Sequence, residues 1–94
     1  MAAYKILPYT RAQARRLGVK IAPSVSPGKK LDVFAKDGKY ITSVGAKGYL
    51  DFPNYKKLFG KKIADQRRKM YKKRHAADRI VKGSRGYYAD RLLW

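Results

Sequence analysis

Residues 30–44, KLDVFAKDGKYITSV, decide the fold. Two runs rich in β-branched and aromatic residues flank Asp37 and Gly38, a pair that favours a two-residue type I′ turn in a β-hairpin. The resulting register contains three cross-strand pairs: Ala35 with Tyr40, Val33 with Thr42, and Leu31 with Val44. One face of the hairpin then carries Leu31, Val33, Tyr40 and Val44. Because two strands alone are only marginally stable in water, we expect a third strand from residues 4–7 or cover from a later helix.

The N-terminal part of the chain is predicted to hold a short helix and an extended arm. Thr10 and Gln13 fit a capping box at the start of a helix over residues 11–17. Residues 19–29 contain two prolines, two serines and a glycine, which is typical of a linker or of an arm that lies along a partner. This divides the chain into an N-terminal part, residues 1–29, and a module of hairpin, basic helix and docked C-terminus, residues 30–94.

Two further helices are predicted after the hairpin. Asp51 is expected to cap a short helix that ends at Gly60, and the longest helix is expected over residues 61–81. At about 100° per residue, one side of the long helix is apolar and carries Ile63, Ala64, Met70, Tyr71, Ala77 and Val81. The opposite side carries the basic residues Lys61, Arg68, Lys72 and Arg79.

Two arginines and the C-terminal end stand out as candidate partner contacts. Arg67 and Arg74 fall within the apolar side of the long helix. Three interpretations are open: their charged ends reach past the apolar surface to water, they pair with Asp78 or Asp51, or they meet carboxylates or carbonyls of a partner. The C-terminal end is apolar and would promote association if exposed, so we expect it to dock on the chain's own core or on a partner. The candidate partner contacts are therefore Arg67, Arg74, Leu92, Leu93 and Trp94.

The composition indicates a small folded protein with a strongly basic surface. The 94 residues include 24 Lys and Arg against 6 Asp and Glu, a formal net charge of +18, and 45% of them are hydrophobic. We expect one α+β module, a hairpin or small antiparallel sheet packed by one long basic helix, with a short N-terminal helix and an extended arm. With no Cys and one His, the sequence predicts no metal site and no cofactor. We expect no membrane span, and His75 lacks the companion residues of a catalytic site.

The excess of positive charge indicates a polyanionic partner, most of all DNA. Self-repulsion also favours folding that is completed on assembly with that partner. The candidate phosphate contacts are Arg15, Arg16, Lys61, Arg68, Lys72 and Arg79. Five aromatic rings beside glycines or basic residues could stack on bases, although a place in the core is the favoured interpretation: Tyr49, Phe52, Tyr55, Tyr87 and Tyr88.

Five segments of the chain occur in a recognisable order: KKLDVF (29–34), DGK (37–39), SVGAKGYLDF (43–52), RRKMYKKRH (67–75) and GYYADRLLW (86–94). Over residues 4–94 the chain resembles small basic domain-of-unknown-function proteins of large double-stranded DNA viruses of algae and protists, the nucleocytoplasmic large DNA viruses. The Tyr-x-x-Arg-His segment that ends at His75 and the final Leu-Trp are the most specific parts. The resemblance implies a virus particle, or the host nucleus or cytoplasm during infection, and it transfers no catalytic residues.

Charge and resemblance together lead to two functional hypotheses. The first is a non-enzymatic virion structural protein that binds genomic DNA, independently of sequence, through the Lys and Arg face of the long helix. The alternative is a minor capsid or cement protein that bridges acidic capsid proteins through its arm and its apolar C-terminus. The net charge favours the first hypothesis, whereas the proline-containing arm and the apolar end favour the second.

Overall fold

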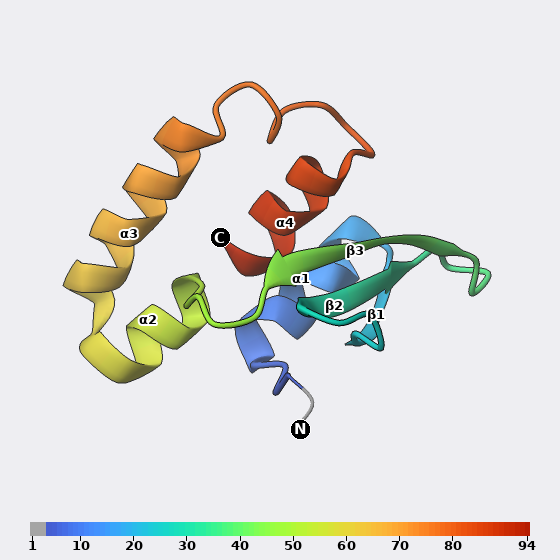
Figure 1. Cartoon of the computed structure of the whole chain (residues 1–94), viewed down its shortest axis with the longest axis horizontal. Coiled ribbons are helices and arrows are strands. Elements are labelled where there is room, and N and C mark those ends of the chain that lie inside the picture. Colours follow the sequence, from blue (N-terminus) through green and yellow to red (C-terminus); the bar gives the residue numbers. More distant parts are fainter. Residues whose placement is uncertain (1–3) are drawn as a thin grey trace.

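The computed structural model describes residues 4–94, so the first three residues of the predicted N-terminal part lie outside the described residues. The described chain forms a three-stranded antiparallel sheet and four helices, which confirms the α+β class (Figure 1). In chain order the elements are α1 (Pro8–Leu17), β1 (Lys20–Pro23), β2 (Lys29–Phe34), β3 (Tyr40–Ala46), α2 (Phe52–Phe59), α3 (Lys61–Arg74) and α4 (Arg85–Leu93). In Figure 1, α4 lies beside the sheet, and α2 and α3 form a hairpin to one side of it.

The central hairpin keeps the predicted register except next to its turn. Leu31 pairs with Val44 and Val33 with Thr42, as predicted. The predicted pair of Ala35 with Tyr40 is wrong, because an irregularity after Val33 places Phe34 opposite Tyr40. Tyr40 therefore leaves the buried face, contacts the Phe34 ring edge-on and is 59% exposed.

The turn itself is longer than the predicted type I′ turn. That turn needs a positive φ at both central residues, and of Asp37 and Gly38 only the glycine has one, at 93°. The Gly38 N–H donates to the Ala35 carbonyl (2.9 Å), and the Ala35 N–H donates to the Lys39 carbonyl (2.8 Å). The Asp37 carboxylate accepts the Lys39 N–H (3.0 Å), which stabilises the three-residue loop and displaces Tyr40 from its predicted partner.

The third strand is β1 and not residues 4–7, whereas the alternative expectation, cover from a later helix, is confirmed because α4 packs on the sheet. The segment 19–29, predicted as a linker or as an arm along a partner, contains β1 and pairs within its own chain. Antiparallel pairing of β1 with β2 puts Ile21 opposite Val33. Beyond this strand, the buried Asp32 carboxylate accepts hydrogen bonds from the Ser24 hydroxyl (2.6 Å) and the Val25 N–H (3.2 Å). The serine-containing segment is therefore tied to the sheet.

Asp32 also binds β3, because its carboxylate accepts a hydrogen bond from the Ser43 hydroxyl at 2.6 Å. Burial alone would raise the pKa of this carboxyl. The hydrogen bonds from Ser24, Ser43 and the Val25 N–H outweigh that effect and lower its pKa below the ordinary value. One ionised side chain thus joins β2, β3 and the segment that follows β1.

Helix α1 begins three residues earlier than predicted. Leu7 is its N-cap and Pro8 occupies the first turn, where proline is well tolerated. The predicted capping box is absent: Thr10 is fully buried within the helix, and the Gln13 amide donates instead to the Arg91 carbonyl of α4 at 2.9 Å. Helix α2 matches its prediction, because the Asp51 carboxylate accepts the Asn54 N–H and Gly60 ends the helix.

The long helix ends at Arg74 and not at residue 81, so its predicted length is wrong. His75 caps α3, and the chain then turns, with the Arg79 N–H donating to the His75 carbonyl (3.0 Å). A further helix that the sequence analysis missed, α4, begins at the Ser84 cap and carries the C-terminal residues back to the sheet.

The core lies between the sheet and helices α1 and α4. Its fully buried members include Leu31 and Val44 from the strands and Leu92 and Leu93 from α4. The apolar C-terminal end thus docks on the chain's own core, which resolves the two alternatives left by the sequence. The prediction that Leu92 and Leu93 are partner contacts is therefore wrong, because neither leucine is accessible.

Candidate functional site

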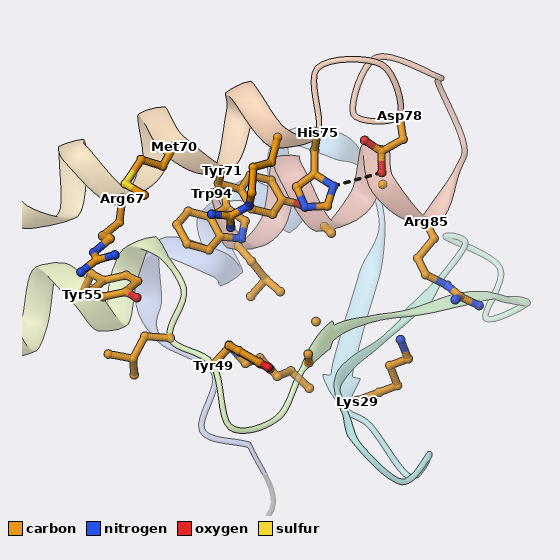
Figure 2. A pocket seen from close by; sticks show the side chains of 18 residues that line it. Lys29, Tyr49, Tyr55, Arg67, Met70, Tyr71, His75, Asp78, Arg85 and Trp94 are labelled. Atoms are coloured by element: carbon orange, nitrogen blue, oxygen red, sulfur yellow. Dashed lines mark hydrogen bonds and ion pairs between the residues drawn. The ribbon is translucent and has the colours of Figure 1, made fainter.

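A cleft of about 480 Å³ opens between α3 on one side and β3, the β3–α2 loop and α4 on the other. Side chains from every one of these segments line it, together with the first residues of β2. In Figure 2, Arg67 and Arg85 stand toward opposite ends of the cleft, with aromatic rings between them. A volume of this size is within the usual range of small-ligand pockets, roughly 300–1,000 Å³.

The α3 wall is held in place by basic side chains that point inward. The Arg68 guanidinium lies 3.5 Å from the centre of the Phe52 ring and donates to the Tyr9 hydroxyl (3.3 Å). The Lys72 ammonium lies 2.8 Å from the buried Asp90 carboxylate, and the Arg79 guanidinium lies 3.8 Å from it. The Arg68 contacts attach α3 to α2 and α1, and the Asp90 pairs attach α3 and the following turn to α4.

The prediction that the long helix turns its basic face outward is therefore wrong, because most of this face points toward the rest of the chain. Arg68, Lys72 and Arg79 are only partly exposed and serve the fold, because Phe52 and Asp90 meet them on the inner side of α3. The periodicity grouped Arg68 and Lys72 correctly on one helix face, but Arg79 lies beyond the end of the helix.

Three stacked rings, the aromatic row, run along α3 at the cleft. Trp94 stacks on Tyr71 at 4.4 Å between ring centres and an interplanar angle of 7°, and Tyr71 stacks on His75 at 4.4 Å. Burial, and then the nearby Asp90 and Asp78 carboxylates, raises the pKa of Tyr71 to about 12, against an opposing effect of Arg74. Tyr71, the central ring of the row, is therefore neutral at physiological pH. Trp94, one of the predicted partner contacts, stacks on a residue of its own chain.

The other arginines of α3 face the cleft. The Arg67 guanidinium lies 5.6 Å from the centre of the Tyr55 ring, and both Arg67 and Arg74 are exposed. Their predicted ion pairs are wrong, because Asp51 pairs with Lys30 and Asp78 with His75. The side of α3 that looked apolar in the sequence borders this open cleft, so it can accommodate two charged residues.

The opposite wall presents an exposed ring on a well-anchored loop. Tyr49 is 74% exposed, and the Tyr49 N–H donates to the Ala46 carbonyl (3.4 Å) in a tight turn. Just beyond it, the buried Asp51 carboxylate pairs with the Lys30 ammonium (3.0 Å) and accepts the Tyr4 hydroxyl (2.6 Å). Burial and the Asp51 carboxylate together raise the pKa of Tyr4, so the phenol stays protonated and keeps donating.

Close packing also shapes the far end of the cleft. A Cβ at Gly86 would lie 2.8 Å from the nearest Asp78 carboxylate oxygen, so a larger residue there would displace the Asp78 side chain. The Asp78 carboxylate in turn accepts a hydrogen bond from His75 Nδ1–H across 3.2 Å, drawn as a dashed line in Figure 2. The pair holds the imidazole at the end of the aromatic row.

The remaining predicted phosphate contacts lie outside the cleft. Arg15 and Arg16 are exposed on the last turn of α1. Lys61 hydrogen bonds to Asp65 at 2.7 Å, and this contact lowers the pKa of the Asp65 carboxyl. Sequence reasoning missed Lys29 and Arg85, which line the cleft, because only the return of α4 to the sheet brings them to it.

The cleft thus combines free cationic groups with flat rings. None of Arg67, Arg74, Arg85 and Lys29 has a carboxylate within ion-pair distance among residues 4–94. Guanidinium and ammonium groups of this kind bind phosphates and carboxylates, and heterocyclic bases stack on aromatic rings.

Comparisons with family models, curated proteins and solved structures find no match to this chain. Within the part of the chain that the structure describes, no helix has both the length and the apolar character needed to cross a membrane.

Proposed function

We propose that this protein binds nucleic acid, DNA most of all and without sequence specificity, as a non-enzymatic structural component of a virus particle. Nucleic-acid binding rests on the cleft and on the net charge of +18. The virus particle rests on the resemblance described above. The cleft replaces the outward helix face as the proposed binding surface, because Arg68, Lys72 and Arg79 are engaged within the fold.

The observation that carries the proposal is the position of Arg67 and Arg74. Both arginines project from the cleft side of α3 without a carboxylate partner among the described residues. Arg85 adds a third guanidinium at the first position of α4, where the helix dipole is also positive and favours an anion. Each phosphate neutralised by such a group releases a counterion, which is the main source of sequence-independent affinity.

The capsid-bridging alternative has less support. Its two sequence features were an extended arm and an apolar C-terminus. The arm contains strand β1, and the leucines of the C-terminus are buried in the core. An acidic protein surface could still meet the basic cleft, so the test must separate nucleic acid from protein as the partner.

The test is the affinity for mixed-sequence DNA over a series of salt concentrations, measured by fluorescence anisotropy. We expect the logarithm of affinity to fall steeply and linearly with the logarithm of salt. Changing Arg67→Gln together with Arg74→Gln should make the slope shallower by about 1.4–1.8, from 0.7 per phosphate contact in single strands and 0.9 in duplexes.

The matched control changes Arg11→Gln together with Arg15→Gln, two exposed residues of α1 outside the cleft. It removes the same charge and should leave the slope closer to that of the wild type. Binding that is weak or insensitive to salt would contradict the proposal and would favour a protein partner. Equal slopes for the two double variants would contradict the cleft as the binding surface.

A further inference from the structure

We infer that the cleft takes an unpaired strand, with one base stacked on Tyr49 and phosphates on either side of that base bound toward the two ends of the cleft. This inference rests on the proposed function and deepens it, because it names single-stranded nucleic acid as the preferred partner. It is carried by three features of the cleft: an aromatic ring left free, the anchored loop that carries this ring, and cationic groups on both sides of it.

Tyr49 is the ring that remains free. Tyr71, Trp94 and His75 use their faces on one another, and Tyr55 lies under Arg67. Tyr49 belongs to none of the ring pairs or cation–π contacts found among residues 4–94, and it is 74% exposed. An exposed, unpaired aromatic ring in a basic cleft is the arrangement that single-strand binding proteins use as a stacking platform.

The loop that carries Tyr49 is also anchored on both sides of this residue. The tight turn from Ala46 precedes it, and the buried Lys30–Asp51 ion pair follows it within two residues. A ring on an anchored loop loses little further freedom when a base stacks on it, so more of the stacking free energy remains for binding.

The cationic groups lie on both sides of this ring. In Figure 2, Arg67 stands toward one end of the cleft, Arg85 and Lys29 toward the other, and Tyr49 lies between them, across from the aromatic row. A strand running along the cleft would place one phosphate near Arg67 and another, further along the strand than the next nucleotide, near Arg85, with a base between them turned toward Tyr49. Charge and stacking would therefore act on different groups of the same strand.

Geometry then favours an unpaired strand over a duplex. In a duplex the base faces are stacked on their neighbours and only the base edges are open in the grooves. A side-chain ring can stack on a base only after that base leaves the stack. A duplex can still place its phosphates on the rim of the cleft, but it cannot use Tyr49 without losing base pairing.

The experiment compares three probes on the wild-type protein: an oligothymidylate, an abasic deoxyribose-phosphate strand of the same length, and a duplex of that length. Anisotropy of the labelled probe gives the affinity. The fluorescence of Trp94, the single tryptophan, reports occupancy of the cleft directly. We expect the oligothymidylate to bind more tightly than the abasic strand and to quench Trp94 more strongly than the duplex does.

The variant Tyr49→Ala should weaken binding of the oligothymidylate by roughly 5- to 150-fold, the loss expected from one base stack, and leave binding of the abasic strand unchanged. The matched control is Tyr40→Ala, which removes another exposed tyrosine from outside the cleft and should change neither affinity. The variant Tyr49→Phe keeps the ring and should restore wild-type binding, which distinguishes stacking from a change in the loop.

The possible failures are distinguishable. Equal affinity of the wild type for the oligothymidylate and the abasic strand, or equal effects of Tyr49→Ala and Tyr40→Ala, would overturn this inference and leave the proposed nucleic-acid binding intact. Salt-insensitive or undetectable binding of all three probes would overturn the proposed function itself, and this inference with it.

Discussion

Two regions of the molecule are stabilised by different kinds of contact. The first is the sheet with α1 and α4, and the second is the helical hairpin of α2 and α3. In the first region, buried aliphatic side chains such as Leu31, Val44 and Leu92 fill the space between the sheet and the helices. In the second, α3 is attached through the Arg68 guanidinium over Phe52 and the Lys72–Asp90 ion pair. Figure 1 shows this hairpin standing to one side of the sheet.

This difference explains how so small and basic a chain keeps a cleft open. Aliphatic packing is close and leaves few gaps, so the sheet region forms the rigid part of the fold. Long basic side chains cover apolar surface with their stems and reach a partner with their charged ends, so they can attach a helix without closing the space beside it. The cleft lies where the two kinds of contact meet.

The largest effect is expected from cutting into the sheet region. The variant Leu92→Ala removes a fully buried side chain and should lower the free energy of unfolding by about 2–5 kcal/mol. Its matched control is Leu58→Ala, at a leucine of α2 that is 59% exposed, which should change stability by no more than about 0.5 kcal/mol. Urea denaturation measures both variants. Equal losses would show that the two regions do not differ as described.

A smaller effect is expected from releasing α3. The variant Asp90→Asn leaves the Lys72 ammonium and the Arg79 guanidinium without their buried carboxylate and should cost about 1–3 kcal/mol of unfolding free energy. The control Asp65→Asn breaks the exposed pair with Lys61 and should leave stability nearly unchanged. If both variants unfold at the wild-type urea concentration, Asp90 does not anchor the hairpin.

The close approach of β3 to α4 can be tested with two glycines. Both Gly45 and Gly48 have positive φ, but only at Gly45 would a Cβ meet another side chain, the Leu93 Cδ1 at 2.8 Å. Gly45→Ala should therefore cost more unfolding free energy than Gly48→Ala, by about 1 kcal/mol or more. Similar thermal and urea stabilities of the two variants would argue against tight packing at this contact.

The smallest expected effect is on how much stability the protein loses as the pH falls. Because the pKa of Asp32 is lower in the folded protein than in the unfolded chain, its ionised form stabilises the fold above the unfolded pKa. That contribution is lost as the pH falls through the lower, folded pKa. Urea denaturation at decreasing pH should show a shallower acid loss for Asp32→Asn than for the wild type, and an intermediate one for Ser43→Ala. An unchanged acid response in Asp32→Asn would contradict the described network.

The features that could be predicted from the sequence are those set by residues that lie close together along the chain. The hairpin pairs of Leu31 with Val44 and Val33 with Thr42 follow from alternation around one turn, and the Asp51 cap follows from its own helix. Strand β1 was missed because Pro23 and the serines after it resemble a linker. Their attachment to the sheet depends on hydrogen bonds from Ser24 and Val25 to Asp32, which is seen only in the folded structure.

The cleft could not be predicted in the same way. Periodicity shows which residues share a face of α3, but not which face meets the rest of the chain when both faces carry basic residues. The deciding partners, Asp90 for Lys72 and Phe52 for Arg68, lie on other helices. A charge reversal at Arg68 and Lys72 would therefore disturb the attachment of α3 and would not isolate an effect on DNA binding.

The most direct test of the central claim is a nuclear magnetic resonance titration of the ¹⁵N-labelled protein with an oligothymidylate. If nucleic acid binds in the cleft, we expect the largest shifts at the Trp94 indole N–H and at the amides of Tyr49 and Arg74. These residues line the cleft from three different segments of the chain. Shifts confined to the exposed arginines of α1, with the Trp94 indole unmoved, would contradict the account and would place the nucleic acid elsewhere on the basic surface.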